Sequence, residues 1–181
     1  AGSLISLHDP IVRSQGDVSF ADYTGASLHI LAGGSVTVAG DINITGVDTT
    51  ANSLQETITL SDGSQISIDG SIQPTLDIRA GTNNPGVAGV TGEDIAIKST
   101  DTATSSNISI NGTVNNPGGQ VFLTNQYQTN SELAGENITV TAIDTSNASG
   151  NGGDVTIDSR NNINIPNGIN TSSIVDSQLI T

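Results

Sequence analysis

The chain has 181 residues and a formal net charge of −14, with 18 acidic residues, four basic residues and no cysteine. A nucleic-acid partner is excluded because binding to phosphates needs clustered Lys and Arg, and the same deficit argues against an anionic membrane surface. The absence of cysteine also excludes disulfides, thiolate metal sites and thiol nucleophiles.

Short runs of alternating apolar and polar residues recur along the chain, and each predicts a strand with one buried face. In chain order they are SLISL (3–7), DVSF (17–20), SLHIL (27–31), SVTV (35–38), DINIT (41–45), TITL (57–60), QISI (65–68), TLDI (75–78), DIAI (94–97), NISI (107–110), QVFL (120–123), NITV (137–140), DVTI (154–157) and NINI (162–165). Turn-forming Gly, Asn, Asp and Pro separate them. The sequence therefore predicts an all-β fold with very short strands.

One phrase of alternating apolar residues followed by glycine recurs at uneven spacing. A second phrase, LHILAG at residues 28–33, returns as LDIRAG at residues 76–81. Such repeats predict coils of about 20–25 residues interrupted by inserts, and hence a parallel β-helix. At about 22 residues per coil, the chain would form about eight coils and a rod near 40 Å long. Inward side chains should stack in columns, one of them formed by Val36, Ile66, Ile108 and Ile163, where the copies of the first phrase begin.

Glycine in the first phrase is expected to turn the corners of the coil, where a positive φ costs little without a Cβ. Four glycine-rich stretches are predicted to protrude as inserts: residues 82–93, 114–119, 126–136 and 145–154. The alternative fold is an antiparallel β-sandwich, which needs tight hairpins. The Asp-Gly pair in LSDGSQIS (60–67) is one possible hairpin of that kind.

Residues 16–46 (GDVSFADYTGASLHILAGGSVTVAGDINITG) and residues 148–165 (ASGNGGDVTIDSRNNINI) resemble filamentous-haemagglutinin-like exoproteins, especially the cyanobacterial ones. The resemblance implies a right-handed parallel β-helix, two-partner secretion through an outer-membrane transporter, and a role in adhesion at the cell surface. The secretion domain of that family carries Asn-Pro-Asn-Gly-Ile near its start. The nearest match, Ile165-Pro166-Asn167-Gly168-Ile169, lacks the first Asn and lies late in the chain, so residues 1–181 are identified as one shaft segment of a longer chain.

No catalytic residue is predicted. Polysaccharide-active β-helices need clustered carboxylates with basic residues nearby. Arg79 beside Asp77 and Arg160 beside Asp158 are the only candidates of this kind. Both arginines are expected to form surface ion pairs, which contribute little to stability. A polysaccharide-binding or lyase-like β-helix remains the alternative function.

No metal or cofactor site is predicted either. His8 and His29 are too few for a metal site without carboxylates, and His29 is expected to be solvated because it lies between Leu28 and Ile30. NGGDVTID and SDGSQISID resemble calcium-binding repeats without their tandem copies. Calcium is thus a further alternative, and the carboxylates concerned are expected to be turn and cap residues: Asp62, Asp69, Asp154 and Asp158.

These observations predict a secreted, non-enzymatic spacer and adhesive element that does not insert into membranes. Its expected partners are cell-surface or extracellular-matrix components, with carbohydrate as one candidate. Strand edges at the two ends of an excised rod would be unpaired. We therefore expect copies to stack end to end into filaments, unless terminal segments such as SLISL fold over as caps.

Overall fold

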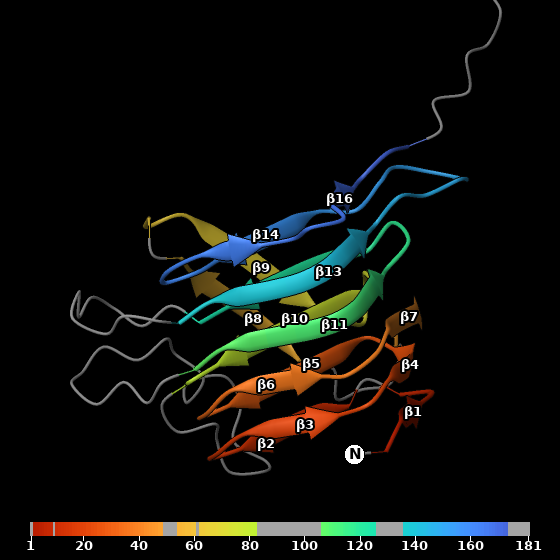
Figure 1. Ribbon diagram of the computed structural model, residues 1–181. Coiled ribbons are helices and arrows are strands. Elements are labelled where there is room, and N and C mark those ends of the chain that lie inside the picture. The colour runs from red at the N-terminus through yellow and green to blue at the C-terminus, as the bar shows by residue number, and fades with distance from the viewer. Residues whose placement is uncertain are drawn as a thin grey trace, which may run out of the picture.

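The structure is a computed structural model that describes residues 2–8, 10–48, 54–60, 62–82, 106–125 and 136–173. These residues form parallel strands in stacked sheets and contain no helix. A helix able to cross a membrane is therefore absent from the described residues. The all-β prediction is confirmed. The arrangement is compatible with a β-helix (Figure 1).

Two sheets and one hairpin make up the fold. Sheet A contains β1 (Leu4–Ser6), β3 (Val18–Phe20), β4 (Tyr23–Ala26), β6 (Val36–Val38), β7 (Ile42–Gly46), β11 (Ile108–Asn115), β13 (Ile138–Asp144), β15 (Ile163–Asn164) and β16 (Ile169–Asn170). Sheet B contains β2 (Ile11–Ser14), β5 (Leu28–Ala32), β10 (Thr75–Ala80), β12 (Gln120–Thr124) and β14 (Val155–Asp158). The hairpin pairs β8 (Gln55–Thr59) with β9 (Gln65–Asp69).

The chain returns to the same row of strands after 18 residues where nothing is inserted, as from Val18 to its partner Val36. This repeat is shorter than the predicted 20–25 residues. Val36 and its next partner, Ile108, are 72 residues apart in the sequence, which is four times the shortest repeat. Inserts therefore use much of the chain, and sheet B stacks five described strands rather than the eight coils expected.

Inward side chains form columns through the stack, because parallel pairing places equivalent residues one above another about 4.8 Å apart. Three of the four residues predicted for one column do share it, but Ile66 does not, because it lies on β9 of the hairpin. The second phrase behaves as predicted, with Leu28 paired to Leu76 and Ile30 to Ile78. The complete described column is Val18, Val36, Ile108, Ile138 and Ile163.

A polar ladder runs beside this column, one residue earlier in each layer. The side-chain oxygen of each member accepts a hydrogen bond from the backbone N–H of the next. The bonds, 2.8–3.2 Å long, join Asp17 to Ser35, Ser35 to Asn107, Asn107 to Asn137 and Asn137 to Asn162. These corner residues therefore satisfy backbone donors that a neighbouring strand does not pair.

The corner glycines of the first phrase fall into two groups. Gly168 has the predicted positive φ, 82°, whereas Gly40 and Gly112 are absent from the positive-φ glycines. A Cβ on Gly112 would instead meet the carbonyl oxygen of Gly40 in the stacked layer well inside contact distance. Stacked corners approach too closely for any side chain at this position.

Substituting Gly112→Ala is therefore expected to destabilise the chain by roughly 1–3 kcal/mol, because backbone on both sides must move to admit the methyl group. Gly46→Ala is the matched control, since a Cβ there meets no atom within 4 Å. Urea unfolding followed by circular dichroism measures both. Equal stability of the two variants would contradict the close-packing explanation.

The predicted inserts and cap have mixed outcomes. Val114 and Asn115 of the 114–119 stretch belong to β11, and the buried Asn116 forms the corner, so this stretch is not a protruding insert. Residues 145–154 do lie between β13 and β14. Residues 83–93 and 126–135 of the other two stretches, like DIAI at 94–97, lie outside the described residues. SLISL does not fold over as a cap, because its β1 pairs parallel with β4.

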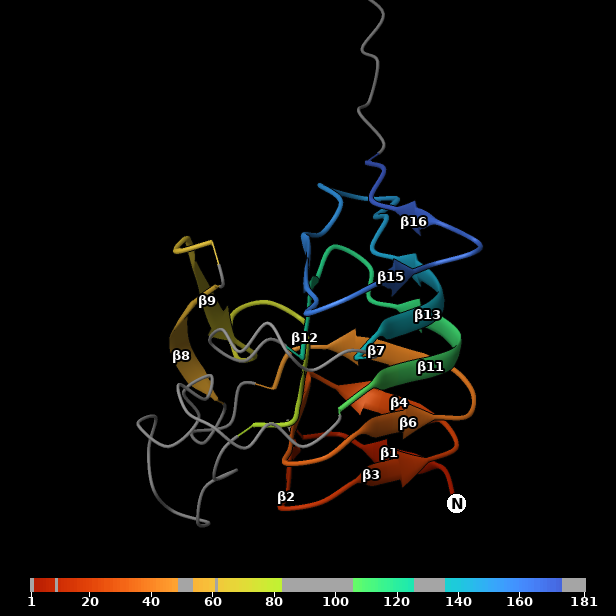
Figure 2. The same ribbon diagram turned by 60° about the vertical axis from the view of Figure 1, so that its left-hand side comes forward.

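The predicted Asp-Gly hairpin is confirmed. β8 and β9 pair antiparallel, and Gly63 has a φ of 85° in the turn between them. Every other described strand pair is parallel, which rules out an antiparallel sandwich for the described part of the chain. The hairpin is thus an insert between β7 and β10 that lies outside the stack (Figure 2).

Candidate functional site

The hairpin covers the outer face of sheet B, the face turned away from the main apolar core. Ile58 and Ile68 of the hairpin pack with Phe122 of β12 in a separate buried cluster. Leu54, just before β8, packs with Leu31 of β5 in a second one. The hairpin thereby shields from solvent the part of sheet B that carries most of its charged side chains.

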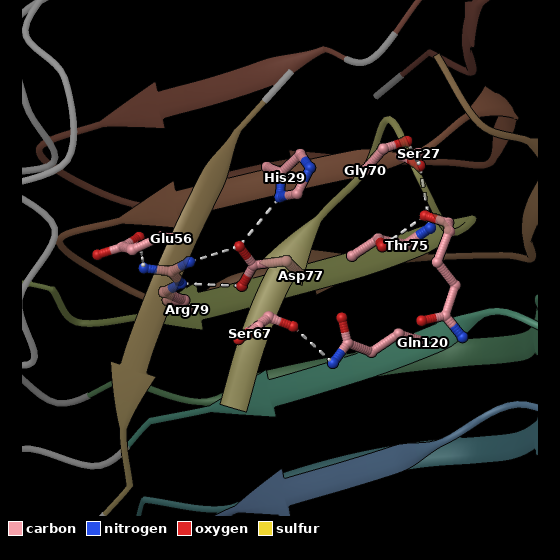
Figure 3. Close-up of polar contacts among 10 residues, drawn as sticks. Ser27, His29, Glu56, Ser67, Gly70, Thr75, Asp77, Arg79 and Gln120 are labelled. Carbon is pink, nitrogen blue, oxygen red and sulfur yellow. Dashed lines mark hydrogen bonds and ion pairs between the residues drawn. The ribbon is translucent and has the colours of Figure 1, made fainter. Parts of the chain in front are cut away.

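Three side chains of sheet B and one of the hairpin form a charged cluster with little or no exposure: His29, Asp77 and Arg79 with Glu56 (Figure 3). The Arg79 guanidinium donates to both carboxylate oxygens of Asp77, from Nε at 2.9 Å and from Nη2 at 2.7 Å. Its Nη1 donates to Oε2 of Glu56 on the hairpin at 2.8 Å. Nδ1 of His29 lies 3.0 Å from Oδ2 of Asp77, and an ionised carboxylate can only accept, so Nδ1 is the donor.

Strand alternation and register bring the cluster together. Leu76 and Ile78 point into the core, so Asp77 and Arg79 must point outward on the same strand. The pairing of β10 with β5 sets His29 directly beside Asp77, and its pairing with β12 sets Phe122 on the other side. Only Glu56 comes from the hairpin.

Two opposing effects set the pKa values of the cluster: burial disfavours the charged forms, and neighbouring opposite charges favour them. Burial alone would raise the pKa of the Asp77 carboxyl, but the Arg79 charge and the hydrogen bonds from His29 and Arg79 outweigh it and lower the pKa below 3.8. Burial opposes the charged form of Arg79, yet Asp77 and Glu56 raise its pKa. Asp77 and Arg79 are therefore both ionised at neutral pH, as a paired charge in a dry environment.

Two predictions about these residues are wrong. Arg79 does not form a surface ion pair, because its side chain is 1% exposed. His29 does point away from the core, as the alternation indicated, but it is 0% exposed rather than solvated. No feature of the local sequence around either residue shows that a distant insert will cover it.

Arg160 is also paired differently from the prediction. Its Nη1 lies 3.7 Å from Oε2 of Glu136, and both side chains are at most 8% exposed. Burial raises the pKa of the Glu136 carboxyl, although the charge of Arg160 opposes that rise. The backbone N–H of Arg160 donates to Asn125, which fixes the chain after β14. The backbone carbonyl of Asp158, the carboxylate residue that the sequence set beside Arg160, accepts a hydrogen bond from the Thr124 hydroxyl.

The carboxylates considered for calcium have local roles where the structure defines them. Asp62 accepts hydrogen bonds from both the backbone N–H and the hydroxyl of Ser64, and Asp69 does the same for Ser71. Both are the turn residues predicted. His8 is 74% exposed and lies 3.8 Å from Asp48. Across the described ranges, three or more metal-ligating side chains do not gather into one group.

The charged cluster can hold the hairpin to sheet B, and in this conformation its arginine is not accessible to a ligand in solution. Arg79 has its donors directed to Asp77 and Glu56 and has almost no exposed surface. Arg79 and Asp158 lie in one row of sheet B, separated by Thr124, and Arg160 follows two residues after Asp158. Each arginine is paired with its own carboxylates, Arg79 with Asp77 and Glu56, and Arg160 with Glu136. Searches against protein-family models, curated proteins and solved structures found no match to this chain.

Proposed function

We propose that this chain is a non-enzymatic, structural shaft segment of a secreted exoprotein of the filamentous-haemagglutinin-like kind. In this proposal the stacked parallel strands form a right-handed parallel β-helix, the hand that parallel β crossovers almost always take. The segment serves as a stiff spacer at the cell surface or in the extracellular matrix. The loops between its strands are the parts that meet other molecules.

The polar ladder from Asp17 to Asn162 is the observation that carries this proposal. Its side chains use their hydrogen-bonding oxygens to join one layer to the next, and the adjacent aliphatic column fills the space inside. Each layer is therefore fixed to its neighbours by backbone pairing, a side-chain hydrogen bond and apolar packing together. Such an arrangement supports a mechanical role, because bending would strain all three contacts at once.

A distance measurement between spin labels tests the stiffness. The chain has no cysteine, so Ser19→Cys on β3 and Asn164→Cys on β15 can be labelled specifically. Both positions are exposed and lie in one row of sheet A, separated by Thr37, Ser109 and Thr139. Four strand spacings amount to about 19 Å. We expect one narrow distance distribution near that value, broadened only by the label linkers.

Two results would count against the proposed function. A broad or bimodal distance distribution would contradict a stiff spacer. Release of unsaturated sugars from polyuronate by the purified chain would contradict a non-enzymatic role. The second assay is independent of the first, so each part of the proposal can fail separately.

A further inference from the structure

We propose that the β8–β9 hairpin is a removable flap, and that beneath it the Asp77-oriented guanidinium of Arg79 is a docking site for the carboxylate of an acidic, otherwise apolar β-strand segment. Glu56 occupies this site in the closed chain. The proposal concerns sheet B and does not depend on the spacer role.

The hairpin can leave without breaking either sheet. Its strands pair only with each other, and the described strands of sheets A and B keep all their own partners without it. Apart from the segments that connect it to the chain, it is held by side chains. Among the described residues these contacts include the Glu56–Arg79 pair, the 3.1 Å bond from Gln120 Nε2 to the Ser67 carbonyl, and the apolar packing on Phe122 and Leu31.

The receptor half of the site belongs to the sheet. Asp77 holds Arg79 through two hydrogen bonds from within the same strand, and His29 contacts Asp77 from the neighbouring strand. Departure of the hairpin leaves this set in place, with Nη1 of Arg79 directed outward. The Phe122 ring, whose centroid lies 5.9 Å from the guanidinium carbon, would form the wall of the opened site.

The present occupant defines the ligand chemistry. Glu56 and Ile58 of β8 alternate with Leu54 just before the strand and Leu60 just after it, and the three apolar residues join the clusters against sheet B. An opened flap exposes Phe122 and Leu31, so a ligand must cover them as well as supply a carboxylate. A strand of pattern Leu-x-Glu-x-Ile-x-Leu does both, whereas a free small carboxylate covers nothing.

The test uses the full chain with Glu56→Gln, which removes the closing carboxylate but keeps Arg79. Hydrogen exchange should quicken at least ten-fold for hairpin amides in residues 55–69, with no change in β5, β10 and β12. Asp154→Asn is the charge-matched control, because Asp154 is exposed and lies just before β14, outside the hairpin. The control should leave exchange in the hairpin unaltered.

Binding is then measured with two fluorescein-labelled peptides, LQETITL and LQQTITL. We expect the Glu56→Gln chain to bind the glutamate peptide at least ten-fold more tightly than the glutamine peptide, and the wild-type chain to bind the glutamate peptide at least ten-fold more weakly than the variant does. Equal binding of both peptides, or no binding, would overturn the docking site. Faster exchange throughout sheet B in the variant would overturn the flap, since the hairpin would then not open as a separate unit.

Discussion

Replacing Arg79 with methionine is expected to destabilise the chain by about 3–5 kcal/mol, among the largest effects of any single substitution in the described residues. The methionine side chain fills much of the same space, so the loss is electrostatic. Asp77, which is 0% exposed, would keep its charge without the guanidinium that gives it two hydrogen bonds. Urea unfolding at neutral pH measures the effect.

Arg13→Met is the matched control for this substitution. Arg13 lies in the same row of sheet B, with Leu31 between it and Arg79, but it is only half-buried. An exposed or half-exposed ion pair contributes little, so a loss below about 1 kcal/mol is expected. If both variants lost a similar free energy of unfolding, the buried pairing of Arg79 would contribute no more to stability than a half-buried arginine does.

The same cluster gives the stability a defined pH dependence. The pKa of Asp77 in the folded chain lies below 3.8, so the unfolded chain binds more protons as the pH approaches that value from above. The stability that Asp77 contributes is therefore complete above its unfolded pKa and is lost as the pH falls through the lowered folded pKa. The difference in unfolding free energy between wild type and Asp77→Asn should be constant near neutrality and shrink only below pH of about 4.

Ile108→Ala is expected to cost about 2–5 kcal/mol, since it opens a cavity in the middle of the stacked column. Ile108 is 0% exposed and has Val36 on one side and Ile138 on the other. Ile66→Ala is the informative comparison, because the two residues hold the same place in the repeated phrase. Ile66 is half-buried in the hairpin, so Ile66→Ala should lower the free energy of unfolding by only about 1 kcal/mol.

Thermal or urea unfolding of both alanine variants measures these two costs. A cost at Ile66 equal to that at Ile108 would contradict the register, because it would indicate that Ile66 packs in the main column. Hydrogen exchange adds a second distinction. Ile108→Ala should loosen the strands of sheet A on both sides of β11, whereas Ile66→Ala should act on the hairpin alone.

Local pattern was enough to predict much of the fold. Apolar residues at alternate positions in 35–38 and 107–110 indicated short strands with one buried face, and these segments do contain β6 and the first part of β11. The Asp62-Gly63 pair indicated the hairpin of β8 and β9. These features depend on residues next to one another in the chain, where backbone preferences and side-chain alternation act directly.

Register and burial depended on the tertiary structure. The phrase at Ile66 matches the phrase at Ile108 in its letters, yet one lies in the hairpin and the other in the core. Alternation correctly put His29 and Arg79 on the outer face of sheet B, but an outer face is solvated only if nothing covers it. An insert from a distant part of the chain covers this one and brings Glu56 to Arg79.

By itself, then, the sequence determined the class of fold, the aliphatic columns and the polar corners, because each arises from a short repeated pattern. Only the tertiary structure decided which copies of the pattern stack on one another, and that Asp77 and Arg79 of sheet B are buried. The physical reason is that a strand's alternation specifies two faces, while the contacts each face makes depend on segments that the chain brings together only on folding.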